Sequence, residues 1–302
     1  MQIDQIDLKI IRALENGNRP FLTTVASQWQ IKKEEVEARV KKFEAERLIK
    51  GYKMIISIPS FLGGDWTLGC LLGIASNPTK VVSVLAQKLN FIIEVFHNLP
   101  VPEGIGPNLN ILFYTQDFPT SSQIIKETEE FDYVEVYKLQ EYAIPVPTIL
   151  SSAEQELIRK IYNNPTVQVP ELLDNQTLEW IEEKINQLLS PPNGIARLLP
   201  ELDWQVCENF AHIHFLIEKG TLSNLSSNEI PESYRSLLKT MVWTSQPFQN
   251  RFYQVETDIW GVNDFSTKVK MLKGAGVKVK GFILAETNQI INDWISKHLP
   301  SL

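Results

Sequence analysis

Two stretches of this 302-residue chain repeat one pattern of apolar residues, and the two copies lie about 147 positions apart. Such self-similarity indicates an internal duplication, so each half of roughly 150 residues should fold as one copy of a shared architecture. The second copy has drifted, because the spacing shifts from 147 to 145 further along. The matched positions are Ile3, Ile10, Ile11 and Leu14 with Leu150, Leu157, Ile158 and Ile161, and Val36, Val40 and Phe43 with Ile181, Ile185 and Leu188.

The first copy opens with three predicted helices. An apolar stripe at Ile6, Ile10, Ile11 and Leu14 indicates the first helix. The second should span 22–29 and the third 33–46, with only a tight turn between them. Two helices joined by so short a turn form a helix-turn-helix, whose second helix is built to enter the major groove of DNA.

The charge distribution agrees with that prediction. The whole chain has a net charge of −7, whereas residues 1–53 hold eleven Lys or Arg against eight Asp or Glu. Positive charge concentrated on one domain of an acidic protein is typical of a local nucleic-acid contact. An ordinary pair of Glu37 with Lys41 is the alternative explanation of this pattern. The residues that we expect to contact phosphate or lie in or beside the groove are Lys32, Lys33, Glu34, Glu35, Ala38, Arg39, Lys41, Lys42 and Arg47.

The remainder of each half alternates strand-like and helix-like segments. In the first half the order is strand, helix, two strands, helix, strand, which predicts a ferredoxin-like βαββαβ sandwich. The predicted segments are 66–74, 78–89, 92–98, 109–115, 121–130 and 133–143. A stiff Pro145-Val146-Pro147 linker should follow.

The second half should repeat this layout. Its third helix, predicted at 177–189, carries Glu179, Glu182 and Glu183 against a single Lys184, so that surface would repel phosphate. The later segments predict strands at 210–218, 251–255, 259–263 and 277–285, with helices at 232–239, 265–273 and 288–298.

These predictions give an α+β chain with a winged helix-turn-helix and a ferredoxin-like domain, the pair being repeated with a degenerate second copy. The expected domains are 1–53, 63–145, 150–200 and 204–302. Two cysteines, Cys70 and Cys207, form no disulfide framework and no zinc spacing, so we expect a cytoplasmic protein. No segment is long and apolar enough to predict a membrane span, and we expect neither a cofactor nor a metal ion.

The first half resembles the Lrp/AsnC, or feast/famine, family of transcriptional regulators. The resemblance lies in Ile3-Asp4-x-x-Asp7-x-x-Ile10-Ile11-x-x-Leu14, in the segment 36–44 and in Leu48-Ile49-Lys50-Gly51-Tyr52. It covers about residues 3–145, and the second half is similar in layout only. It implies binding to double-stranded DNA at promoters, assembly into dimers or larger homo-oligomers, and control by a small-molecule effector.

The effector site that this resemblance implies would lie near the turn between the second and third strands. There the family usually carries acidic residues, whereas this sequence has asparagines, so the ammonium of a free amino acid would lose its charged partner. The candidate effector-binding residues are Gly106, Asn108, Asn110 and, in the second half, Asp258. Solvated strand ends are the alternative for Asp258.

A second, weaker resemblance is to the siroheme decarboxylases, which share this two-domain layout. It lies in His97-Asn98 followed by Asn110-Ile111-Leu112-Phe113. It implies an enzyme of tetrapyrrole biosynthesis with His97 as a proton donor, against the alternative of a structural histidine.

His212 and His214 stand two apart on a predicted strand and so share one face. They could form a metal pair, but we find no carboxylate or cysteine nearby in the sequence that completes a ligand set. Ordinary hydrogen bonds on a sheet face are therefore the favoured interpretation. Taken together, these features predict a DNA-binding regulator, with the decarboxylase as the alternative.

Overall fold

The computed structural model describes residues 1–16, 22–62, 64–103, 105–139, 150–165, 176–189, 195–221, 242–243, 248–249 and 251–291. The N-terminal unit has the three expected helices, α1 (Gln5–Glu15), α2 (Leu22–Gln28) and α3 (Lys33–Ala45). Asp4 caps α1, because its carboxylate accepts the backbone N–H of Asp7 while Asp7 accepts the N–H of Asp4. Val36, Val40 and the fully buried Phe43 pack α3 against the other two helices.

The two predicted βαββαβ units are joined into one antiparallel sheet of eight strands, in the order β5-β2-β4-β3-β10-β7-β9-β8. The first unit contributes β2 (Thr67–Ile74), α5 (Pro78–Lys88), β3 (Ile92–Val101), β4 (Leu109–Thr115), α6 (Phe118–Lys126) and β5 (Tyr133–Lys138). The second contributes β7 (Ala211–Glu218), β8 (Val242–Trp243), β9 (Phe252–Ile259), α10 (Gly261–Gly274) and β10 (Val279–Ile290).

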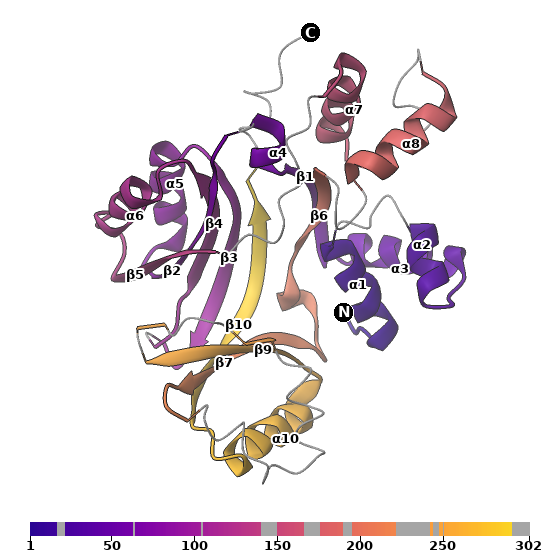
Figure 1. The fold of residues 1–302 in the computed structure, drawn as a ribbon. Coiled ribbons are helices and arrows are strands. Elements are labelled where there is room, and N and C mark those ends of the chain that lie inside the picture. Colours follow the sequence, from indigo (N-terminus) through magenta and orange to yellow (C-terminus); the bar gives the residue numbers. More distant parts are fainter. Residues whose placement is uncertain are drawn as a thin grey trace.

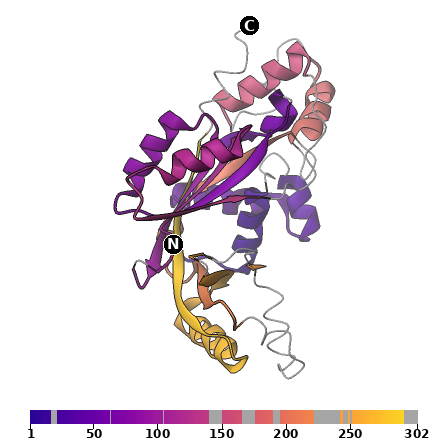
Figure 2. The ribbon, with the colours of Figure 1, turned by 60° about the vertical axis from the view of Figure 1, so that its left-hand side comes forward.

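The seam between the halves is the pairing of β3 with β10, which runs from Phe282 opposite Val101 to Ile290 opposite Glu94. The sheet curls at this seam, with β10 crossing from one half to the other (Figures 1 and 2). Two separate apolar cores bury one face of the sheet, one beneath α5 and α6 and one beneath α10. The other face is turned toward α1 and the strand that precedes β7.

A two-stranded ribbon of β1 (Ile49–Ile56) and β6 (Ala196–Leu202) connects the two copies. Ile49 pairs with Leu202 at one end, where the ribbon packs on the N-terminal helices, and Ile56 pairs with Ala196 at the other. That second end packs on α7 (Ser152–Asn163) and α8 (Leu178–Leu189) of the second copy. Each strand thus leads from its own helical unit to that of the other copy.

The helical units are consequently exchanged between the halves. The core of the N-terminal unit includes Trp204 and Phe210 from the second half, whereas the core around α7 and α8 includes Phe91 and Trp66 from the first. Trp66 and Trp204 pack where each helical unit meets the other half. Each packs edge-on or tilted against a phenylalanine, with ring centroids 4.9 Å and 5.1 Å apart.

Several predicted boundaries are wrong. The strand expected at 259–263 does not form, because β9 ends at Ile259 and α10 begins at Gly261. The helix expected from Asn288 is also wrong at its start, since the pairing with β3 extends β10 to Ile290. Residues 56–62 hold a short helix, α4 (Ile58–Leu62), and 204–206 form the single turn η3 (Trp204–Val206). The helix at 232–239 and the linker at 145–147 lie outside the described residues.

None of the helices in the described ranges combines the length and the hydropathy that crossing a bilayer requires.

Candidate functional site

The first candidate site is the solvent-facing side of α3, which we call the α3 surface. It comprises the exposed residues Lys32, Lys33, Glu34, Glu35, Ala38, Lys41, Lys42 and Arg47. They are exposed because the opposite stripe of α3 is buried in the N-terminal core. Lys33 forms an ion pair with Glu37 at 3.5 Å, one turn along the helix, and Lys42 reaches the backbone oxygen of Gln2 at 3.5 Å.

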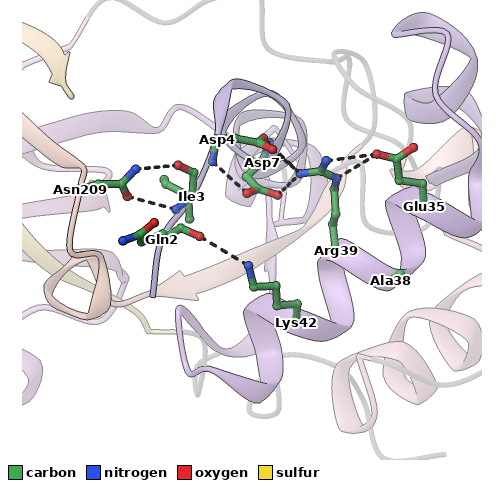
Figure 3. A pocket seen from close by; sticks show the side chains of 9 residues that line it. All are labelled: Gln2, Ile3, Asp4, Asp7, Glu35, Ala38, Arg39, Lys42 and Asn209. Carbon is green, nitrogen blue, oxygen red and sulfur yellow. Dashed lines mark hydrogen bonds and ion pairs between the residues drawn. The ribbon is translucent and has the colours of Figure 1, made fainter. Parts of the chain in front are cut away.

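Arg39 differs from the other predicted contact residues, because carboxylates surround its guanidinium (Figure 3). Its nitrogens lie 2.9 Å from Asp4, 2.6 Å from Asp7 and 3.1 Å from Glu35. Burial opposes the charged form, but these hydrogen bonds outweigh it and raise the pKa of Arg39. The ion pairs fix α3 against the start of α1.

Next to Arg39 the surface is hollowed into a cavity of about 560 Å³. It is lined by Gln2, Ile3, Asp4, Asp7, Glu35, Ala38, Arg39, Lys42 and Asn209 (Figure 3). Asn209 of the second half closes one side, because its amide exchanges two hydrogen bonds with the backbone of Ile3, at 3.1 Å and 2.9 Å. The cavity is acidic on its Asp4 and Asp7 side and basic at Lys42.

The second candidate site is a cluster of charged side chains between α1 and the inner face of β7 and β9, which we call the polar joint. Its members are Arg12, Glu15, His212, His214, Gln254, Glu256 and Asp258. Arg12 of α1 donates to Asp258 at 2.6 Å and to Glu15 at 2.8 Å. The ring of Trp204 lies beneath its guanidinium, 5.8 Å from centroid to Cζ.

The two histidines sit at the centre of the polar joint. His212 Nδ1 lies 2.9 Å from Asp258 Oδ1, and its Nε2 lies 3.2 Å from Glu256 Oε1. His214 Nδ1 lies 3.1 Å from Gln254 Oε1. Strand register explains this convergence, because His212 is aligned with Asp258 and His214 with Glu256 across the β7–β9 pair.

The charges of the polar joint shift the acid–base behaviour of its members. Burial disfavours a charged His212, but its hydrogen bonds with Asp258 and Glu256 outweigh that and raise the pKa to about 9. Burial and the neighbouring His212 lower the pKa of His214 to about 4. The hydrogen bond with His212 lowers the pKa of Glu256 to about 2. At neutral pH, Glu256 is therefore a carboxylate and His214 a neutral imidazole.

The four predicted effector-binding residues do not meet in one place. Asn108 bonds both backbone groups of Ala75, at 2.7 Å and 3.0 Å, and so ties two segments together. A side chain at Gly106 would meet Ile283 and Leu216 at 3.0 Å, so this glycine allows close packing. Asn110 lies on β4 with its Oδ1 buried and without a hydrogen-bond partner in the described part of the chain. Asp258 belongs to the polar joint.

His97, the catalytic residue of the alternative hypothesis, lies in β3 opposite Thr287 of β10 and Leu109 of β4. It is half-buried, and burial lowers the pKa of its ring. A lowered pKa favours the neutral ring, which is a weaker proton donor.

The expectation that no carboxylate accompanies His212 and His214 is wrong, since Glu256 approaches both. Sequence reasoning missed Glu256, Glu15 and Arg12 as members of this cluster. A signal was present, because Glu256-x-Asp258 has the same i, i+2 spacing as the histidines, and such spacing places both side chains on one face. What the sequence did not disclose is that these two strands are neighbours in register.

Comparison with family models finds no match for this chain, and comparison with curated proteins finds none either. Among solved structures, the siroheme decarboxylase NirDL aligns over 98% of this chain and 97% of its own, with 9% identity and a TM-score of 0.47. AsnC of E. coli aligns over 49% of this chain and 99% of its own, with 23% identity and a TM-score of 0.29. LrpC of B. subtilis aligns over 47% and 98%, with 16% identity and a TM-score of 0.31.

Both families that the sequence resembles thus occur among the matched structures, the decarboxylase along the whole chain and the regulators along about half of it. At these identities the similarity is one of fold.

Proposed function

We propose that this protein is a DNA-binding transcriptional regulator that places α3 of its N-terminal unit in the major groove. The observation that carries the proposal is the exposure of Lys32, Lys33, Lys41, Lys42 and Arg47 around a helix whose other side is buried. Lysines at both ends of such a helix can reach the phosphates on either side of a groove, and each contact releases counterions.

The helix itself would read bases through its first turns. Glu34, Glu35 and Ala38 lie between the two lysine pairs, and a carboxylate there can accept a hydrogen bond from the amino group of cytosine. Arg39 serves a different purpose in this proposal, because its bonds to Asp4 and Asp7 hold α3 at a fixed angle to α1. It is a positioning residue and not a base contact.

One chain would supply one such DNA-contacting helix. In the second copy, α8 exposes Glu179, Glu182 and Glu183, which would repel phosphate. We therefore propose that two copies of the chain associate to place two α3 helices on two half-sites, about one helical turn of DNA apart or a multiple of that distance.

The test is binding to a duplex of about 30 base pairs taken from upstream of its own gene, titrated at several salt concentrations by fluorescence anisotropy; this length spans two half-sites. We expect Lys41→Gln with Lys42→Gln to weaken binding at least about tenfold and to reduce the slope of log K against log salt by about 2. The matched control is Lys88→Gln with Lys126→Gln, which removes the same charge from exposed ends of α5 and α6.

Equal losses in the two double variants would show that only net charge matters, and the proposal would fall. It would fall equally if the unmodified protein bound the duplex with no dependence on salt. Neutralising the second copy with Glu182→Gln and Glu183→Gln should leave the affinity within about twofold, because charges beyond about 10 Å are screened in 0.1 M salt.

The alternative, a decarboxylase acting on a siroheme-like tetrapyrrole, stays a prediction. It requires His97 to act as an acid, whereas the burial of that ring favours its neutral form. Incubation of the purified protein with siroheme tests it directly, since decarboxylation removes carbon dioxide and lowers the mass of the product. The mass loss would have to disappear in His97→Ala.

A further inference from the structure

Three potential metal ligands come together in the polar joint. His212 and His214 of β7 and Glu256 of β9 each offer one ligand atom, and these atoms all lie within 4.8 Å of one another. His212 Nε2 and Glu256 Oε1 are 3.2 Å apart. Two ligands that are bound tetrahedrally to zinc at about 2.0–2.1 Å stand about 3.3 Å apart, so this pair already has the separation that a shared ion requires.

The second observation concerns the other nitrogen of each ring. His212 Nδ1 lies 2.9 Å from Asp258 Oδ1 and 3.0 Å from the guanidinium of Arg12, which itself donates to Asp258. His214 Nδ1 lies 3.1 Å from the amide oxygen of Gln254. Each ring thus has a polar partner at Nδ1, and outer contacts of this kind are what orient histidines in metal sites.

The corresponding place in the first half carries none of these groups. Thr67 pairs with Thr115 in the same manner as Ala211 pairs with Ile259, so the registers of the two strand pairs coincide. The positions of His212, His214, Glu256 and Asp258 are then occupied by Leu68, Cys70, Leu112 and Tyr114. The cluster is thus a property of the second half and not a requirement of the fold.

We propose that His212, His214 and Glu256 bind a divalent first-row transition-metal ion such as Zn²⁺, with Asp258 and Gln254 orienting the two imidazoles. Two imidazoles and one carboxylate suit ions of this class and leave coordination positions open. Three carboxylates, Glu15, Glu256 and Asp258, lie around Arg12 and His212, so acidic groups outnumber basic ones in the joint.

The site is connected to the N-terminal helices. Asp258 bonds both His212 and Arg12 of α1, and α1 in turn is tied to α3 through the ion pairs of Arg39. An ion that binds His212 therefore also affects Asp258, and Asp258 in turn holds Arg12 of α1. The metal proposal stands on the ligand geometry alone and does not depend on DNA binding.

The experiment is isothermal titration of the chelator-treated full chain with ZnCl₂, followed by the absorption spectrum of the Co²⁺ form. We expect one ion per chain, a raised thermal midpoint, and visible Co²⁺ bands typical of nitrogen and oxygen ligands. His214→Ala and Glu256→Gln should each abolish these responses, and Glu256→Gln keeps the size of the side chain so that the fold is retained.

The matched control is His97→Ala, which removes a histidine of β3 that lies outside the cluster. It should bind Zn²⁺ as the unmodified protein does. The proposal is overturned if the unmodified protein takes up no Zn²⁺, which would make the polar joint a set of ion pairs only, or if all three variants bind equally, which would place the ion elsewhere. Circular dichroism of each metal-free variant establishes that it is folded.

Discussion

Each helical unit packs on the sheet of the other half. The two junctions have the same arrangement but differ in the side chains that form them. The second unit packs on the aromatic side chains of Trp66, Phe91 and Tyr114. The N-terminal unit packs on Trp204 and Phe210 as well, but beside them Arg12 enters a cluster of histidines and carboxylates. At the strand positions of these histidines and carboxylates the first half has Leu68, Cys70, Leu112 and Tyr114, so the histidine–carboxylate cluster, whose energy depends on protons, ions and salt, belongs to the junction of the N-terminal unit.

The contrast also extends to the outer surfaces. The helix α3 has five exposed cationic side chains at or beside its ends, whereas α8 exposes Glu179, Glu182 and Glu183 and has Asn186 and Gln187 at the positions of Lys41 and Lys42. The unit with the cationic surface is therefore the same one that is joined to the rest of the protein through charges. A change of ions at the polar joint would act on α1 through Arg12 and on α3 through the ion pairs of Arg39.

The largest effect should come from the tryptophan anchors. Trp204 is buried, and its replacement in Trp204→Ala should lower the free energy of unfolding by about 3–5 kcal/mol. Trp66→Ala should cost about 1–2 kcal/mol less, because Trp66 is only partly buried. Urea denaturation followed by circular dichroism measures both. Equal costs would mean that the two junctions contribute alike and that the asymmetry is confined to charge.

A smaller effect is expected from the ion pairs of Arg12. Arg12→Gln should lower the free energy of unfolding by about 1–2 kcal/mol. The loss is limited because the Arg12 side chain is partly exposed, and water weakens the contribution of its ion pairs to stability. A double-mutant cycle with Asp258→Asn isolates the direct interaction between the two side chains. The matched control is Lys80→Gln, which removes an exposed pair with Glu130 and should cost less than about 0.5 kcal/mol. A coupling energy near zero would contradict the view that this pair holds α1 to β9.

The smallest effect concerns Glu94, at the seam where the two halves meet. Burial raises the pKa of Glu94 to about 7, against the hydrogen bond from Asn288 and together with the charges of Glu15 and Glu201. A carboxyl whose folded pKa is raised destabilises the protein in its charged form, so this penalty is absent below about pH 4.5 and complete above about pH 7. Lys53 lies 3.4 Å from Glu201 and moderates its charge.

Glu94→Gln should therefore raise the free energy of unfolding at pH 8 and leave it unchanged at pH 4; we expect a gain of about 1 kcal/mol, because Glu94 is only half-buried and water screens much of the penalty. Denaturation at the two pH values measures the difference. As a control, Glu127→Gln, on an exposed residue, should show no such dependence. The same gain at both pH values would mean that Glu94 is not the group responsible.

Much of the fold could be predicted because it depends on local spacing. The stripe at Ile10, Ile11 and Leu14 predicted α1, and the alternation of strand and helix segments predicted the first βαββαβ unit and, in the second half, β7, β10 and the helix α10. The errors occurred where a contact distant in sequence decides a boundary. Pairing with β3 keeps Asn288 to Ile290 in a strand, although their apolar spacing also suits a helix. The candidate site followed the same rule, since exposed lysines on α3 were foreseen and the bonds of Arg39 to the start of α1 were not.

By itself, the sequence determined the elements, the duplication and the acidic drift of the second copy, because hydrophobic periodicity and charge are properties of neighbouring residues. Only the tertiary structure decided that the helical units are exchanged, that β3 meets β10, and that Glu256 and Arg12 join two histidines. The physical reason is that strand pairing and register depend on burying a whole face of the sheet, which involves residues far apart in the sequence. Arg12 and Asp258, for example, are 246 positions apart, and no pattern in the sequence shows that they will be in contact.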